Sequence, residues 1–131
     1  MKDGNALDRA QELKARTKLF ALRVLKVFRA IPKSEEGRVM GRQLLRSGTS
    51  VGANYRAVCR ARSRKEFISK LNVVVEEADE TVFWLELLIE GEVLPVRKLE
   101  KLIAEANELL AILAASVRTA KTAKKRGLSM N

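Results

Sequence analysis

The sequence contains no histidine, one cysteine and two prolines in 131 residues. Without histidine, the chain lacks the most common general base and the most common metal ligand of proteins. The single cysteine, Cys59, can form neither an intramolecular disulfide nor a zinc site, and we expect it to be a small buried residue. No Glu-x-x-His motif and no phosphate-binding glycine loop is present. We therefore expect a protein that is not an enzyme and that needs no metal or cofactor.

Long apolar runs, turn formers and aromatic residues are also scarce. No apolar run is long enough to span a membrane, and the first seven residues lack the apolar core of a signal peptide. Together with the single cysteine, this indicates a cytoplasmic protein without a membrane partner. The few aromatic residues do not alternate with basic ones, so any contact with nucleic acid would be mainly to phosphates.

Apolar residues recur at helical spacing in four long segments. The expected helices span about residues 8–31, 34–62, 63–90 and 95–118. Ser34 and Ser63 suit helix N-caps, and Gly91 suits a left-handed C-terminal cap. Because the breaks are short, consecutive helices should run antiparallel. The sequence thus predicts an all-α, antiparallel up-down-up-down four-helix bundle over residues 1–120, followed by a basic, disordered tail over residues 121–131.

Three stripes of residues predict how these helices pack. In the first segment, Leu19, Leu22 and Leu25 lie outside the main apolar stripe, which predicts contact with a neighbouring subunit. The second segment carries small residues on one side, which predict close approach of another helix: Gly37, Gly41, Gly48 and Gly52. A polar stripe on the same segment predicts buried hydrogen bonds that fix helix register, with a functional pocket as the alternative: Gln43, Ser47, Ser50 and Asn54.

Charge is unevenly distributed along the chain, whose net charge is +10. Residues 37–65 contain eight basic and no acidic residues, whereas residues 66–92 contain eight acidic residues and one lysine. At about 100° per residue, a continuous second helix would place six arginines in one arc. These are Arg38, Arg42, Arg46, Arg56, Arg60 and Arg64. The tail adds Lys121, Lys124, Lys125 and Arg126.

Two interpretations of the arginine arc remain open. Arginine forks match phosphate oxygens, so the arc would bind a nucleic-acid backbone. Alternatively, the same arginines pair with the acidic third segment, within one chain or between chains.

Three motifs resemble those of the 23S rRNA intervening sequence proteins. LLRSGTSVGANY at residues 44–55 resembles the family's R-S-x-x-S-[IV]-x-x-N, which includes Ser47, Ser50 and Asn54. SRKEFISKL at residues 63–71 is similar to S-x-x-[ED]-F-x-x-K-L, and EADETVFWLELL at residues 77–88 to E-A-x-E-T-x-[YF]-W-L-x-L-L. The resemblance implies an antiparallel four-helix bundle that assembles into a ring-shaped homopentamer. A related branch of the family binds nucleic acid and a reverse transcriptase.

These observations lead to two competing hypotheses of function. The first is a non-enzymatic, oligomeric bundle that binds the phosphate backbone of RNA or DNA with low sequence specificity. The alternative is a protein-interaction scaffold that docks an acidic or nucleic-acid-bound partner, such as a reverse transcriptase or another nucleic-acid-processing protein.

Overall fold

The computed structural model describes residues 6–125, and only the backbone of residues 124 and 125. Within this range the chain forms four helices and no strand, which confirms the predicted all-α class. The helices are α1 (Ala6–Ala30), α2 (Glu35–Cys59), α3 (Arg64–Glu90) and α4 (Val96–Lys125). No helix in the described part of the chain is both long and apolar enough to cross a membrane.

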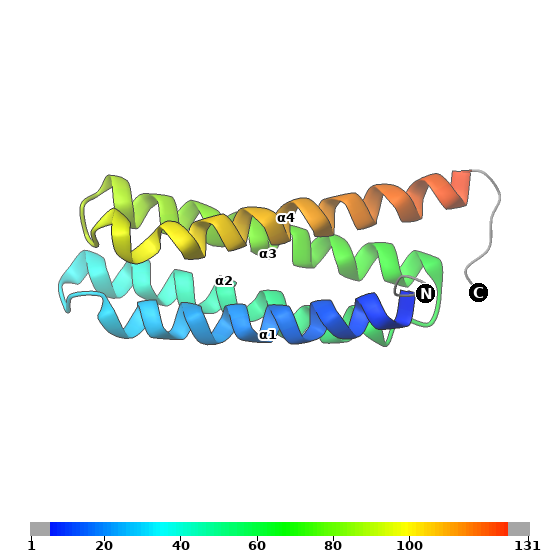
Figure 1. Ribbon diagram of the computed structural model, residues 1–131, viewed down its shortest axis with the longest axis horizontal. Coiled ribbons are helices and arrows are strands. Elements are labelled where there is room, and N and C mark those ends of the chain that lie inside the picture. The colour runs from blue at the N-terminus through cyan, green and yellow to red at the C-terminus, as the bar shows by residue number, and fades with distance from the viewer. Residues whose placement is uncertain (1–5, 126–131) are drawn as a thin grey trace.

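The four helices lie lengthwise beside one another in an elongated molecule (Figure 1). The α1–α2 and α3–α4 connections lie at one end and the α2–α3 connection at the other, so consecutive helices run in opposite directions. Helices that follow one another in sequence pack closely, whereas α1 and α4 make the least extensive contact. The seam between α1 and α4 is therefore the loosest side of the bundle.

Serine caps begin two of the helices, as the sequence predicted. Ser34 Oγ accepts a hydrogen bond from the Gly37 backbone N–H at 3.0 Å, and Ser63 Oγ accepts one from the Glu66 backbone N–H at 3.1 Å. The Glu66 carboxylate in turn accepts a hydrogen bond from the Arg62 backbone N–H at 2.9 Å. These bonds satisfy backbone donors that have no partner inside the helix.

Two helix ends differ from the predictions. Gly91 caps α3 with a φ of −82°, and Glu92 adopts the left-handed conformation instead, with a φ of 59°. The prediction of a left-handed conformation at Gly91 is therefore wrong, since the next residue adopts it. At the other end of the chain, α4 continues to Lys125 and so includes five residues of the expected tail. Val117 and Ala120 are still buried there, which explains why the helix does not end at Arg118.

The glycine stripe of α2 packs against α1, which confirms the predicted close approach of another helix. A Cβ atom at Gly48 would lie 2.8 Å from both γ-carbons of Val24, and one at Gly52 would lie 3.1 Å from the Thr17 carbonyl oxygen. Both distances are shorter than or at the limit of normal contact. Because the partner helix belongs to the same chain, the stripe is explained without a second subunit.

One residue of the polar stripe forms a buried hydrogen bond between helices. Ser47 is fully buried, and its Oγ accepts a hydrogen bond from Thr81 Oγ1 of α3 at 3.0 Å. By contrast, Asn54 donates to the Ser50 carbonyl of its own helix at 2.9 Å, and Gln43 accepts from Arg46 at 3.2 Å. Of the polar stripe, only Ser47 therefore forms the kind of buried hydrogen bond that the sequence predicted, here between α2 and α3.

Candidate nucleic-acid interface

The helix that carries most of the predicted arginines is continuous but shorter than expected. α2 runs without a break through Gly48 and ends at Cys59, not at Arg62. Arg60 is its C-cap, with φ −105° and ψ 12°. Its backbone N–H donates to the Ala57 carbonyl at 3.1 Å, and the Ala61 N–H donates to the Val58 carbonyl at 3.0 Å. The predicted single arc is therefore wrong beyond Cys59, because the chain turns before it reaches Arg64.

Arg46, in the middle of α2, is paired with the acidic α3. Its guanidinium contacts Glu77 at 3.3 Å and also forms an ion pair with Glu80. The pKa of Glu80 is lowered by hydrogen bonds from Trp84 and from Arg46. The alternative interpretation of the arginines is thus correct at this position, and Arg46 is not a free phosphate ligand.

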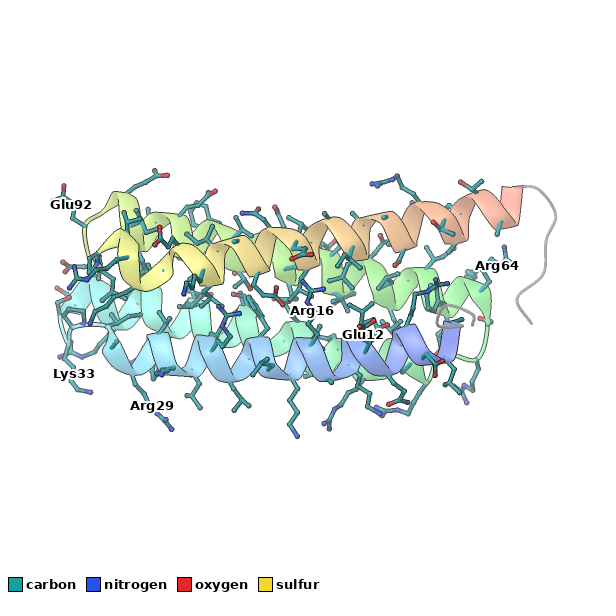
Figure 2. All side chains as sticks on the ribbon, in the orientation of Figure 1. Glu12, Arg16, Arg29, Lys33, Arg64 and Glu92 are labelled. Atoms are coloured by element: carbon teal, nitrogen blue, oxygen red, sulfur yellow. The ribbon has the colours of Figure 1, made fainter. Side chains whose placement is uncertain are left out.

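Arg64 is the second predicted ligand that the structure removes from the surface. Arg64 is only 8% exposed, and its Nη1 lies 3.5 Å from the Ala120 carbonyl of α4. Nη2 has no hydrogen-bond partner within the described chain. Figure 2 places Arg64 at the end of the bundle that carries the α2–α3 connection. Because it is buried against α4, Arg64 is a structural residue, and its assignment as an exposed phosphate ligand is wrong.

Arg38 and Arg42 are exposed, and they lie beside two further cations that do not belong to the predicted arc of six arginines. Together with Arg29 and Lys33 they line a hollow of about 280 Å³ whose apolar wall includes Phe28. We call these four cations the α1–α2 patch. Figure 2 shows Arg29 and Lys33 at the same end of the molecule, at the α1–α2 connection.

The α1–α2 patch has the features expected of a phosphate-binding surface. No carboxylate lines the hollow, and none of the four cations forms an ion pair with another residue of the range 6–125. Glu35 and Glu36 are nearby in sequence but belong to the first turn of α2 and do not line the hollow. The positive end of the α2 dipole adds to the field of the cations. An anionic group can therefore contact several unpaired cations at once.

A second group of cations lies at the other end of α2. Arg56 and Arg60 are exposed and form no ion pair within the described chain, whereas Arg62 is 3.8 Å from Glu66. We call Arg56, Arg60 and Arg62 the α2–α3 patch. Arg42 and Arg56 are about 21 Å apart along the helix axis, at 1.5 Å per residue. The exposed cations around α2 thus form two separate patches, with the neutralised Arg46 between them.

Cys59 lies within the α2–α3 patch and is exposed. The expectation that it is buried is wrong, because the last turn of α2 buries Tyr55 and Val58 and turns Cys59 to the outside. Burial raises the pKa of the Tyr55 hydroxyl to about 12, so this residue is uncharged at neutral pH. Cys59 belongs to no possible metal site within residues 6–125, where cysteine and acidic residues form no cluster that could hold a metal ion.

The predicted cations of the C-terminal segment are only partly placed. Lys121 is exposed on α4. The side chains of Lys124 and Lys125, and all of Arg126, lie outside the described residues. The structure therefore adds one exposed cation here to those of α2.

The arginine arc predicted from the sequence does not include Arg29 and Lys33, because they lie in α1 and in the turn before α2. A helical hairpin brings the last turn of one helix beside the first turn of the next. The signal was the short break around Pro32, which places Arg29 and Lys33 on the other side of one turn from Arg38 and Arg42. A search for cations on both sides of each predicted turn would have found them.

Comparison with known proteins relates the chain to one family. The family model described as 23S rRNA-intervening sequence protein matches residues 9–115. A solved structure described as a protein of unknown function from the S23 ribosomal protein family of Bacteroides thetaiotaomicron VPI-5482 is 36% identical and superposes with a TM-score of 0.77. The match covers 83% of this chain and 97% of the other. None of the curated proteins matches the chain.

Proposed function

Because the chain belongs to the 23S rRNA-intervening sequence protein family, whose name concerns a ribosomal RNA, we propose that it binds the phosphate backbone of nucleic acid. It does so without catalysis and with low sequence specificity. RNA is the first ligand to test. The observation that carries the proposal is the α1–α2 patch, where four exposed cations surround a hollow without a carboxylate.

The contacts of the basic residues support binding to phosphates more than to bases. Arg38, Arg42, Arg56 and Arg60 are exposed and unpaired within the described chain, so they lose no internal ion pair when they meet a phosphate. The hollow of the α1–α2 patch offers no acceptor side chain and no exposed aromatic ring that would read a base edge or stack on a base. Two patches about 21 Å apart would contact separate parts of one backbone.

Salt dependence tests this proposal directly. We expect a short RNA duplex to bind at low ionic strength and to dissociate between about 50 and 200 mM salt. If the four cations of the α1–α2 patch each displace a counterion, the slope of log affinity against log salt should be about −3 to −4. Fluorescence anisotropy of labelled RNA measures this slope. No binding at low salt, or an affinity independent of salt, would refute the proposal.

A protein scaffold remains the second candidate function, and one surface favours it. Leu19 and Leu22 are 56% and 55% exposed on the outer face of α1. They are one helical turn apart, and contiguous exposed apolar side chains mark protein interfaces. We propose that they mediate self-association. Light scattering on the wild type and on Leu19→Lys/Leu22→Lys measures the mass of the assembly. A monomeric wild type would contradict self-association, and a partner protein captured after nuclease treatment would favour the scaffold.

A further inference from the structure

The seam between α1 and α4 has two chemically different halves. Toward the N-terminus of α1, Arg16 bridges the seam, donating to Glu105 at 2.8 and 2.9 Å and contacting Glu108 at 2.9 Å. Figure 2 shows Arg16 between the two helices. Further along α1, no ion pair between described residues connects the two helices. There the seam opens into a hollow of about 420 Å³. This volume is within the range of small-molecule sites.

The floor of this hollow is aliphatic and its rim is cationic. The floor is formed by Val27, Ala30, Leu94, Leu99 and Leu102. The rim is formed by Arg23, Lys26, Arg97, Lys98 and Lys101. No other residue lines the hollow, so it contains no carboxylate, amide, hydroxyl or aromatic side chain.

The five rim cations are not neutralised by a salt bridge within the described part of the chain. None of them forms an ion pair with another residue of the range 6–125. Glu105 feels the charge of Arg23, but its carboxylate is hydrogen-bonded to Arg16 outside the hollow. Like charges gathered around a low-dielectric surface repel one another, and an anion placed among them relieves that repulsion.

The floor decides which kind of anion fits. A nucleobase would leave its ring nitrogens and exocyclic groups without partners against aliphatic side chains, which is unfavourable. An aliphatic chain needs no hydrogen bonds and gains from every methylene group that leaves water. We propose that this hollow binds an amphiphilic anion, an aliphatic chain that ends in a carboxylate or phosphate, with the chain on the leucine floor and the charge among the rim cations.

This site is separate from the one proposed for nucleic acid. None of its lining residues belongs to the α1–α2 or the α2–α3 patch. It lies between α1 and α4, whereas the nucleic-acid proposal depends on α2, the turns at its two ends and Arg29 of the last turn of α1. Either proposal can therefore fail without the other.

Calorimetric titration with octanoate, butanoate and octanol tests the site. We expect octanoate to bind at least tenfold more tightly than butanoate, because two buried methylene groups are enough for about a tenfold change. Octanol has the chain without the charge and should bind at least tenfold more weakly than octanoate. Equal affinity of octanoate and butanoate, or of octanoate and octanol, would overturn the proposal.

Matched variants locate the binding. Arg97→Gln/Lys98→Gln/Lys101→Gln should weaken octanoate binding about tenfold or more. The control Lys18→Gln/Lys65→Gln/Arg118→Gln removes the same charge from exposed positions away from the hollow and should change it less than about twofold. Ala30→Phe places a large side chain at the exposed edge of the floor and should also weaken binding. Equal losses in the two triple variants, with unchanged thermal unfolding, would contradict the assigned site.

A final comparison distinguishes free amphiphiles from membrane lipids. If the hollow takes its anion from a bilayer, the wild type should sediment with phosphatidylglycerol vesicles. The triple variant of Arg97, Lys98 and Lys101, here called the rim variant, should not sediment with them, and the triple variant of Lys18, Lys65 and Arg118 should. Octanoate binding without vesicle binding identifies a free amphiphile as the source. Vesicle binding that the rim variant leaves intact, without octanoate binding, would refute the site.

Discussion

At the scale of single residues, ion pairing decides which charges are available for function. Arg46 and Arg16 are held by carboxylates of α3 and α4, whereas Arg38 and Arg42 have no acidic partner in the described chain. All four are arginines in helices, and nothing in their own sequence neighbourhoods separates the paired from the unpaired. The difference comes from the helix that faces each one across the bundle.

The Arg16–Glu105 pair gives a pH-dependent contribution to stability. The hydrogen bond from Arg16 lowers the pKa of Glu105 in the folded protein. Its contribution is therefore complete above the pKa of an unfolded glutamate, about 4.3, and is lost as the pH falls through the lower folded value. We expect Glu105→Gln to reduce the free energy of unfolding by about 1 kcal/mol at pH 7 and by much less near pH 3.

Urea unfolding of the wild type and the variant at both pH values measures this difference. Glu108→Gln is the matched control, since the Glu108 side chain is 63% exposed against 17% for Glu105. The control should cost less at pH 7. The same loss for Glu105→Gln at both pH values would show that the pair does not act through its charge.

At the scale of the helices, packing of α2 on α1 depends on the absence of side chains. The glycines allow α2 to approach so closely that a Cβ at Gly48 would overlap Val24. An alanine in place of glycine favours a helix by about 1 kcal/mol, but overpacking of a full core costs about 1–3 kcal/mol. The steric term should be the larger one at Gly48, because Val24 is fully buried and cannot move away.

We predict that Gly48→Ala destabilises the wild type by about 1 kcal/mol but stabilises the Val24→Ala variant. In that variant the γ-carbons that clash with the new methyl group are absent. A double-mutant cycle by thermal or urea unfolding measures the coupling between the two positions. Additive effects would mean that the contact with Val24 does not explain the glycine.

The helices themselves could be predicted from the sequence, but their charged surface could not. Periodicity and the caps at Ser34 and Ser63 are local signals, and they placed four helices with ends near the observed ones. The ion pairing of Arg46 and the burial of Arg64 depend on residues more than thirty positions away, in α3 and at Ala120. A pattern within one helix carries no information on such contacts.

At the scale of the whole molecule, the unpaired cations are gathered in defined places. The acidic α3 neutralises the middle of α2, so the free arginines remain at the two ends of that helix. The loose α1–α4 seam carries a third cationic surface with an apolar floor. The net charge of +10 is thus divided among sites of different chemistry instead of forming one uniform surface.

The measurement that tests the proposed function most directly compares two variants with the same loss of charge. Arg38→Gln/Arg42→Gln removes half of the α1–α2 patch, and Lys18→Gln/Arg118→Gln removes two exposed cations elsewhere. RNA affinity should fall about tenfold in the first variant, with a salt slope smaller by about 2, and should change little in the second. Equal affinities for the two variants would show that RNA responds only to net charge, and this would contradict a binding site at the α1–α2 patch.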